Sequence, residues 1–150
     1  MSDDEVKTTI DIDAPVQDVW EVVMDATKLQ DWVTIHRSLG SHSTGKPSKG
    51  DEMEQKMALR GATFKVKWEL AECEQPTHAL WKGRGPARSH AETQYDLADN
   101  GKGGTTFSYR NVFKAPMGPL GKAASKALVG GLPEKEAKAS LQALKELLEG

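Results

Sequence analysis

Apolar and polar residues alternate over Val6–Asp13, which is the pattern of a strand with one buried face. The segment Asp13-Ala14-Pro15 then predicts a helix start, with Asp13 or Ala14 near the cap and Pro15 in the first turn. An apolar stripe at helical spacing follows, at Val16, Val19, Trp20 and Val23. Thr27 is expected to cap a second short helix, which carries Leu29, Trp32 and Val33.

Strand patterns fill the middle of the chain. The Ser-, Gly- and Lys-rich stretch 40–50 is expected to be a strand end and a turn, and alternation then predicts strands over 51–60, 64–70, 78–82, 89–97 and 107–113. The strand over 89–97 is the clearest, because its opposite face from Arg88 to Asp96 is entirely polar. A glycine-rich hairpin over 99–104 joins the last two strands. Strands that follow one another through short turns indicate an antiparallel sheet.

From about Met117 to Glu149 the apolar spacing becomes helical, and Gly130-Gly131-Leu132-Pro133 interrupts it. One bent helix and two separate helices are both compatible with this pattern. A straight helix of about 33 residues would extend roughly 50 Å, whereas a domain of this size is only about 38 Å across. A bend at the glycines and the proline lets the helix fit, so one bent helix is favoured. We therefore predict one α+β domain over 1–150, with a bent antiparallel sheet of about six to seven strands around a long C-terminal helix.

Composition narrows the classes of function. The chain has 20 Lys and Arg against 22 Asp and Glu, so no positive surplus points to nucleic acid. Lys114, Lys122 and Lys126 are expected to lie on a solvated face. No apolar run approaches the roughly 20 residues of a membrane span, and the first residues lack the features of a signal peptide. We expect a cytoplasmic protein without stable membrane insertion, with a monomer favoured.

The order of elements, together with several short motifs, resembles a known family. Ile12-Asp13-Ala14-Pro15-Val16-Gln17-Asp18-Val19-Trp20 is similar to the opening signature of the SRPBCC superfamily, which includes START-like domains and polyketide cyclase/dehydrase relatives. Similar segments occur at 29–32, 103–105, 113–116 and 140–145, so the resemblance spans essentially the whole chain. Residues 32–37 resemble an actinobacterial subgroup, some of whose members are labelled as toxins of toxin–antitoxin pairs. The resemblance implies a helix-grip fold, but fold alone does not settle function.

A helix-grip arrangement leaves an interior lined by alternate strand residues and one stripe of the long helix. The residues that we expect to bind a ligand there are Trp68, Thr93, Tyr95, Phe107, Tyr109, Asn111, Phe113, Met117, Leu120, Ala124 and Leu128. Asn111 is in phase with three aromatic residues, so its amide should be buried and must find a partner in Tyr95, Thr93, water or a ligand. Trp20 and Trp32 are expected to be packing anchors of the short helices.

Catalytic residues cannot be assigned from the sequence. The four histidines show no metal-ligand spacing, and no metal or cofactor is expected. His36 is the best acid–base candidate, because it follows the second helix near a possible pocket entrance. The single cysteine, Cys73, allows no internal disulfide and should be inert. The leading hypothesis is binding of a lipid, fatty acid, polyketide or isoprenoid-like molecule. A polyketide cyclase/dehydratase-like enzyme and a toxin-like or regulatory partner-binding domain are the alternatives.

Overall fold

A computed structural model describes residues 4–59, 62–85, 88–114 and 132–150 of the chain. Its strands are β1 (Asp4–Ile12), β2 (His36–His42), β3 (Glu52–Leu59), β4 (Ala62–Glu74), β5 (His78–Arg84), β6 (His90–Asp99) and β7 (Thr105–Lys114). Its helices are α1 (Val16–Val23), the short 3-10 helix η1 (Ala26–Lys28), α2 (Leu29–Trp32) and α4 (Leu132–Glu149). The predicted α+β, helix-grip fold is confirmed, with seven strands and two short α-helices after the first strand.

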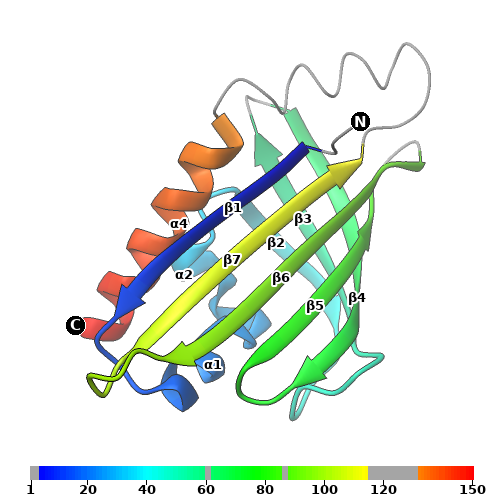
Figure 1. The fold of residues 1–150 in the computed structure, drawn as a ribbon. Helices are drawn as coiled ribbons and strands as arrows, with labels where there is room; N and C mark the ends of the chain where they lie inside the picture. Colours follow the sequence, from blue (N-terminus) through cyan, green and yellow to red (C-terminus); the bar gives the residue numbers. More distant parts are fainter. Residues whose placement is uncertain (1–3, 60–61, 86–87, 115–131) are drawn as a thin grey trace.

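All seven strands belong to one antiparallel sheet, in the order β1-β7-β6-β5-β4-β3-β2. The first strand pairs with the last one, so that Val6 lies opposite Asn111 and Ile12 opposite Thr105. The sheet curves around α1, α2 and α4, which lie together on one side of it (Figure 1). The inner surface of the sheet therefore faces the helices across a shared interior.

The interior is apolar because each strand turns alternate side chains toward the helices. On β6 burial alternates along the strand, with Thr93, Tyr95 and Leu97 buried. The helices contribute Val19, Trp20, Val23, Leu29 and Trp32, and α4 contributes Ala137, Leu141 and Leu144. Each fully buried Val or Leu side chain among these residues stabilises the folded state by about 1.5–3 kcal/mol.

The two short helices begin one or two residues away from the predicted positions. Pro15 is itself the residue before α1, with an extended backbone, so Pro15 caps the helix and Val16 begins it. Thr27 does not cap the second helix but lies within η1, whose cap is Asp25, because Asp25 Oδ1 accepts from the backbone N–H of Thr27 at 3.0 Å. The sequence contained this signal, since Asp is among the preferred capping residues. α2 follows η1 directly and has no side-chain cap.

Several strands also differ from the prediction. β4 runs from Ala62 to Glu74, whereas the prediction was 64–70, and β2 had been expected only as a strand end near residue 40. β5 extends beyond the predicted end at residue 82 to Arg84, and the ring of Trp68 occupies the space where a side chain at Gly83 would lie. β6 begins at His90, not at Ser89, because Arg88 has a φ of 66° and interrupts the extended backbone.

Helix α4 has 18 residues and is tied to the start of the chain. The hydroxyl of the buried Ser140 accepts from the backbone N–H of Thr34 at 3.0 Å. Near its other end Glu149 Oε2 accepts from the backbone N–H of Asp13 at 2.9 Å. The predicted helical stretch from Met117 and the choice between a bend and a break at 130–133 lie largely outside the described residues.

Candidate functional site: the aromatic interior and the pocket beneath the β2–β3 loop

Four aromatic rings form the centre of the interior. Tyr95 and Tyr109 are direct cross-strand partners, and Phe107 lies opposite Leu97 in the neighbouring row. The ring of Trp32 packs against all three, at centroid distances of 5.9 Å to Tyr95, 6.2 Å to Phe107 and 6.1 Å to Tyr109. The structure therefore brings three of the predicted ligand-binding residues together. It also places Trp32 over them as a packing anchor.

The two buried tyrosines keep their protons at neutral pH. Burial raises the pKa of Tyr95 well above its usual value, and the neighbouring Tyr109 adds to the shift. Burial also raises the pKa of Tyr109, although the Asn111 amide acts in the opposite direction. Both hydroxyls are therefore hydrogen-bond donors and not bases.

Asn111 finds its partner on the neighbouring strand. Thr93 and Asn111 lie opposite each other in the β6–β7 register, and the Thr93 hydroxyl donates to Asn111 Oδ1 at 2.6 Å. Thr93 was one of the partners that the sequence suggested. Phe113 is half-buried one row further along, opposite Ala91.

A second polar group of the interior was missed by the sequence analysis. Gln55 on β3 is only 4% exposed; its Oε1 accepts from Trp68 Nε1 at 2.9 Å and its Nε2 lies 2.9 Å from His36 Nδ1. The alternation that predicts a strand over 51–60 places Gln55 on the same face as Met53 and Met57. The phase argument that was applied to Asn111 would therefore have found Gln55 as well.

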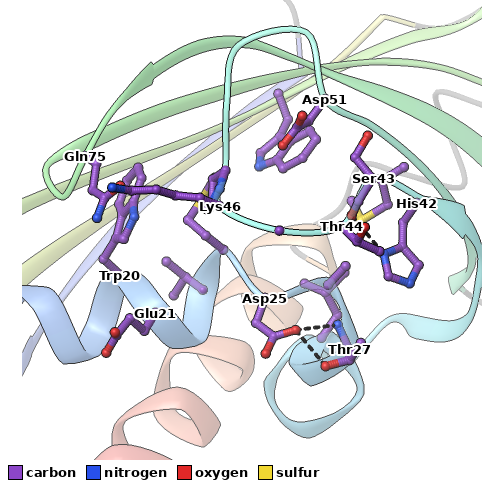
Figure 2. A pocket seen from close by; sticks show the side chains of 18 of the residues that line it. Trp20, Glu21, Asp25, Thr27, His42, Ser43, Thr44, Lys46, Asp51 and Gln75 are labelled. Atoms are coloured by element: carbon purple, nitrogen blue, oxygen red, sulfur yellow. Dashed lines mark hydrogen bonds between the residues drawn. The ribbon is translucent and has the colours of Figure 1, made fainter.

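A pocket of about 520 Å³ lies between α1, η1, the β2–β3 loop (43–51) and the β4–β5 turn at Gln75. Figure 2 shows Trp20 and Gln75 at one side of it, Asp25 and Thr27 at the helices, and the loop with Ser43, Thr44 and Lys46 passing over them. Its walls include seven large apolar or aromatic side chains, which are Trp20, Val23, Met24, Leu29, Met53, Trp81 and Tyr95. Pockets for drug-sized ligands have volumes of roughly 300–1,000 Å³.

The rim of this pocket is polar and carries more negative than positive charge. Glu21, Asp25, Asp51 and Glu52 contribute carboxylates, and Lys46 contributes one ammonium group. Asp25 accepts from Thr27, and Asp51 accepts from the backbone N–H of Ser48 at 3.0 Å, so both carboxylates hold the backbone around the opening. The pocket thus has an apolar interior and a polar entrance.

The predicted site residues fall into three groups with respect to this pocket. Tyr95 lines it, and Trp68 lies directly opposite the lining residue Met53 in the β3–β4 register. The other described residues, which are Thr93, Phe107, Tyr109, Asn111 and Phe113, are on the same inner surface but not in the pocket lining. Met117, Leu120, Ala124 and Leu128 lie outside the described residues.

The remaining reactive side chains do not assemble into a catalytic centre in the part of the chain that the structure describes. No group of three or more His, Cys, Asp or Glu side chains there has the arrangement of a metal site. Cys73 is half-buried, and burial followed by the charge of Asp51 raises the pKa of its thiol, so that little thiolate forms. His78 is held between Asp96 and Glu72, at 2.6 and 2.8 Å.

Comparison with known proteins agrees with the fold and the interior. A family model described as polyketide cyclase/dehydrase and lipid transport matches residues 3–149. The chain belongs to this family. The resemblance to the SRPBCC superfamily that the opening motif indicated is therefore confirmed.

The named relatives share little sequence identity with this chain. The protein named Toxin Rv0910, from Mycobacterium tuberculosis, is 24% identical over 127 residues, which cover 84% of this chain and 88% of that protein. A conserved protein from Geobacillus kaustophilus has a TM-score of 0.74 at 16% identity, covering 97% of this chain and 95% of that one. The Zhui aromatase/cyclase from Streptomyces sp. R1128 has a TM-score of 0.71 at 16% identity, covering 97% and 93%. At these identities the solved structures establish the fold alone.

Among the described helices, none combines the length and the apolar character that crossing a membrane requires.

Proposed function

We propose that this protein binds a small hydrophobic molecule in its interior, with the pocket beneath the β2–β3 loop as part of the site. The observation that carries the proposal is the pocket of about 520 Å³, whose walls are aromatic and aliphatic and whose rim is polar. Membership of a family that includes lipid transport supports it. In this proposal residues 1–150 act as one binding domain, and a monomer is sufficient.

The test is binding of an apolar fluorescent probe together with native mass spectrometry of the purified protein. Ala26 lines the pocket, so Ala26→Trp should fill much of it and weaken probe binding at least about tenfold. The matched control is Ala139→Trp, because Ala139 is an exposed residue of α4 and not in the pocket lining. Equal probe affinity in both variants, or no binding by the parent protein, contradicts the proposal.

A second candidate function is a reaction of the cyclase or dehydratase kind. The observation that favours it is the group formed by Tyr95, Tyr109 and the Thr93–Asn111 pair, in which protonated hydroxyls and an amide lie on adjacent strand positions. A structural neighbour is named as an aromatase/cyclase. In this proposal the tyrosines donate hydrogen bonds to a polyketide, because neither is a base. If Tyr109→Phe and Asn111→Ala leave turnover of a bound polyketide unchanged, the enzyme hypothesis is wrong.

A further inference from the structure

The hydroxyl of Tyr95 is a hydrogen-bond donor without a partner. Tyr95 lines the pocket and is only 5% exposed, and no residue in the described part of the chain forms a hydrogen bond with its hydroxyl. The hydroxyl of its cross-strand partner Tyr109 is bonded to the Asn111 amide instead. A buried tyrosine hydroxyl usually finds a partner, because an unpaired polar group in an apolar wall costs free energy.

This hydroxyl is open to a cavity and is not sealed in the core. Among the described residues, the side-chain nitrogen and oxygen atoms that are completely buried and lack a partner are the indole nitrogens of Trp20 and Trp32. The hydroxyl oxygen of Tyr95 lacks a partner but does not belong to this group. A group of the size of water can therefore reach it, although the residue as a whole is buried.

The pocket reaches Tyr95 from the side of β5. In the sheet Tyr95 lies between Tyr109 on β7 and Ala79 on β5. Ala79 has only a methyl group, so it leaves space beside the ring. Trp81, two residues further along β5, lines the pocket together with Tyr95, whereas no described residue of β7 does. The accessible side of Tyr95 is therefore the side that faces the pocket.

The surroundings of this hydroxyl favour an uncharged acceptor over a carboxylate. The described lining residues carry four carboxylates and one ammonium group, that of Lys46. Burial and the neighbouring Tyr109 are the causes that raise the pKa of Tyr95, and no cation is among them. A carboxylate beside Tyr95 would be buried without a counter-charge, and it would have to pass an entrance of its own sign.

We propose that Tyr95 recognises the polar group of the ligand, and that this group is the uncharged oxygen of a ketone, ester or alcohol on an otherwise apolar molecule. The Tyr95 hydroxyl donates to this oxygen, and the apolar part of the ligand occupies the remaining pocket. Free fatty acids and other carboxylates are then poor ligands. The inference rests on the proposed binding function, and it adds the residue that selects the ligand and the charge class of that ligand.

The test uses three probes with one ring system, which are 2-acetylnaphthalene, 2-ethylnaphthalene and 2-naphthoate. Titration calorimetry measures their binding to the parent protein, to Tyr95→Phe and to the control Thr105→Val, which loses a buried hydroxyl outside the pocket lining. The affinity ratio of the ketone to the hydrocarbon should fall about three- to tenfold in Tyr95→Phe and stay unchanged in the control. The parent protein should bind the ketone at least about tenfold more tightly than the carboxylate.

The charge of the entrance is tested separately. Glu21 and Glu52 are exposed lining residues, and Glu21→Gln/Glu52→Gln should narrow the affinity gap between ketone and carboxylate about two- to fourfold. The control Asp31→Asn/Glu146→Gln removes two exposed carboxylates outside the lining and should leave the gap unchanged. Tighter binding of the carboxylate by the parent protein, or an equal change in both double variants, overturns the charge selection.

A measurement without ligand tests whether the hydroxyl is free. Because no protein group is lost as a partner, the urea midpoint of Tyr95→Phe should match or exceed that of the parent protein, whereas Thr105→Val should lower it. A decrease in Tyr95→Phe as large as in Thr105→Val overturns the inference. So does an unchanged ratio of ketone to hydrocarbon in Tyr95→Phe when both probes bind, and this result leaves the proposed function intact. Binding of none of the three probes contradicts both proposals.

Discussion

Gly83 lies under the ring of its cross-strand partner Trp68, and a Cβ added to Gly83 would come within 2.7 Å of the ring atom Cε3. The same added atom would meet Val66 Cγ1 at 2.7 Å. The absence of a side chain at one position of β5 therefore allows the indole to lie flat on the sheet, where its N–H reaches Gln55.

Substitution of Gly83 by Ala should force this contact apart. We expect Gly83→Ala to lower the free energy of unfolding by about 1–3 kcal/mol, which is the usual effect of overpacking. Urea denaturation measures the change. Combining it with Trp68→Leu should restore part of the loss, because the smaller side chain makes room. A stable Gly83→Ala protein would show that the ring moves aside freely.

Trp32 provides a test of the aromatic centre. Its side chain is 1% exposed and its Nε1 has no hydrogen-bond partner within the described residues. Trp32→Ala should therefore cost about 3–5 kcal/mol through the cavity that it leaves. Trp32→Phe should cost distinctly less, because no hydrogen bond is lost with the indole. Thermal denaturation of the two variants compares them, and equal losses would contradict the packing role.

Thr105 joins the last strand to the segment before α1. It is fully buried, and its hydroxyl donates to the backbone carbonyl of Ala14 at 2.7 Å. Thr105→Val keeps the shape and removes the bond, so we expect a loss of about 1–2 kcal/mol in the free energy of unfolding. The neighbouring Thr106→Val is the control, because its bond to Asp11 is exposed and should contribute less.

His78 should make stability depend on pH. The hydrogen bond with Asp96 is the main cause that raises the pKa of His78 above 6.5, Glu72 adds to it, and burial opposes it. Because the folded state favours the charged ring, this stabilisation is fully present below about pH 6.5 and is lost as the pH rises through the folded-state pKa.

The stability difference between the parent protein and His78→Gln should accordingly shrink between pH 6 and pH 9. Chemical denaturation at several pH values measures it, with His90→Gln as the control for an exposed histidine. A difference that does not change with pH would contradict the assignment.

The contribution of His36 to stability should depend on pH in the opposite direction to that of His78. Burial and Arg37 lower its pKa below 6.5, so the folded state favours the neutral ring. Its contribution is present above about pH 6.5 and is lost as the pH falls through the folded-state pKa. His36→Phe should therefore be less sensitive to acid than the parent protein in that range. A steeper loss of stability in the variant would be inconsistent with this.

The alternating strands were the most predictable part of the molecule. In β6 the outward face is entirely polar and the inward residues Thr93, Tyr95 and Leu97 are buried, so the sequence determines which residues face inward. The cap at Asp25 and the extension of β5 through Gly83 were predicted incorrectly, although Asp is among the preferred capping residues.

The candidate site was less predictable for a different reason. Tyr95 was expected to contact a ligand, and it lines the pocket. However, the opposite wall comes from α1, η1 and the loop 43–51, which are far from β6 in sequence. No local sequence pattern predicts how a turn-rich loop lies over a helix. Gln55 was in phase with Met53 and Met57, but it was not singled out as Asn111 was, although it is the more deeply buried amide.

The pairing of β1 with β7 has a consequence for synthesis of the chain. Val6 and its partner Asn111 are about 100 residues apart, and among the described strands β7 is the only neighbour of β1 in the sheet. At about 5–20 residues per second, the ribosome makes β7 roughly 5–20 s after β1. During that time β1 is an unpaired strand with one apolar face, which a chaperone or a second nascent chain can occupy. β1 can join the sheet only after β7 emerges, so this edge of the sheet forms late in the synthesis of the chain.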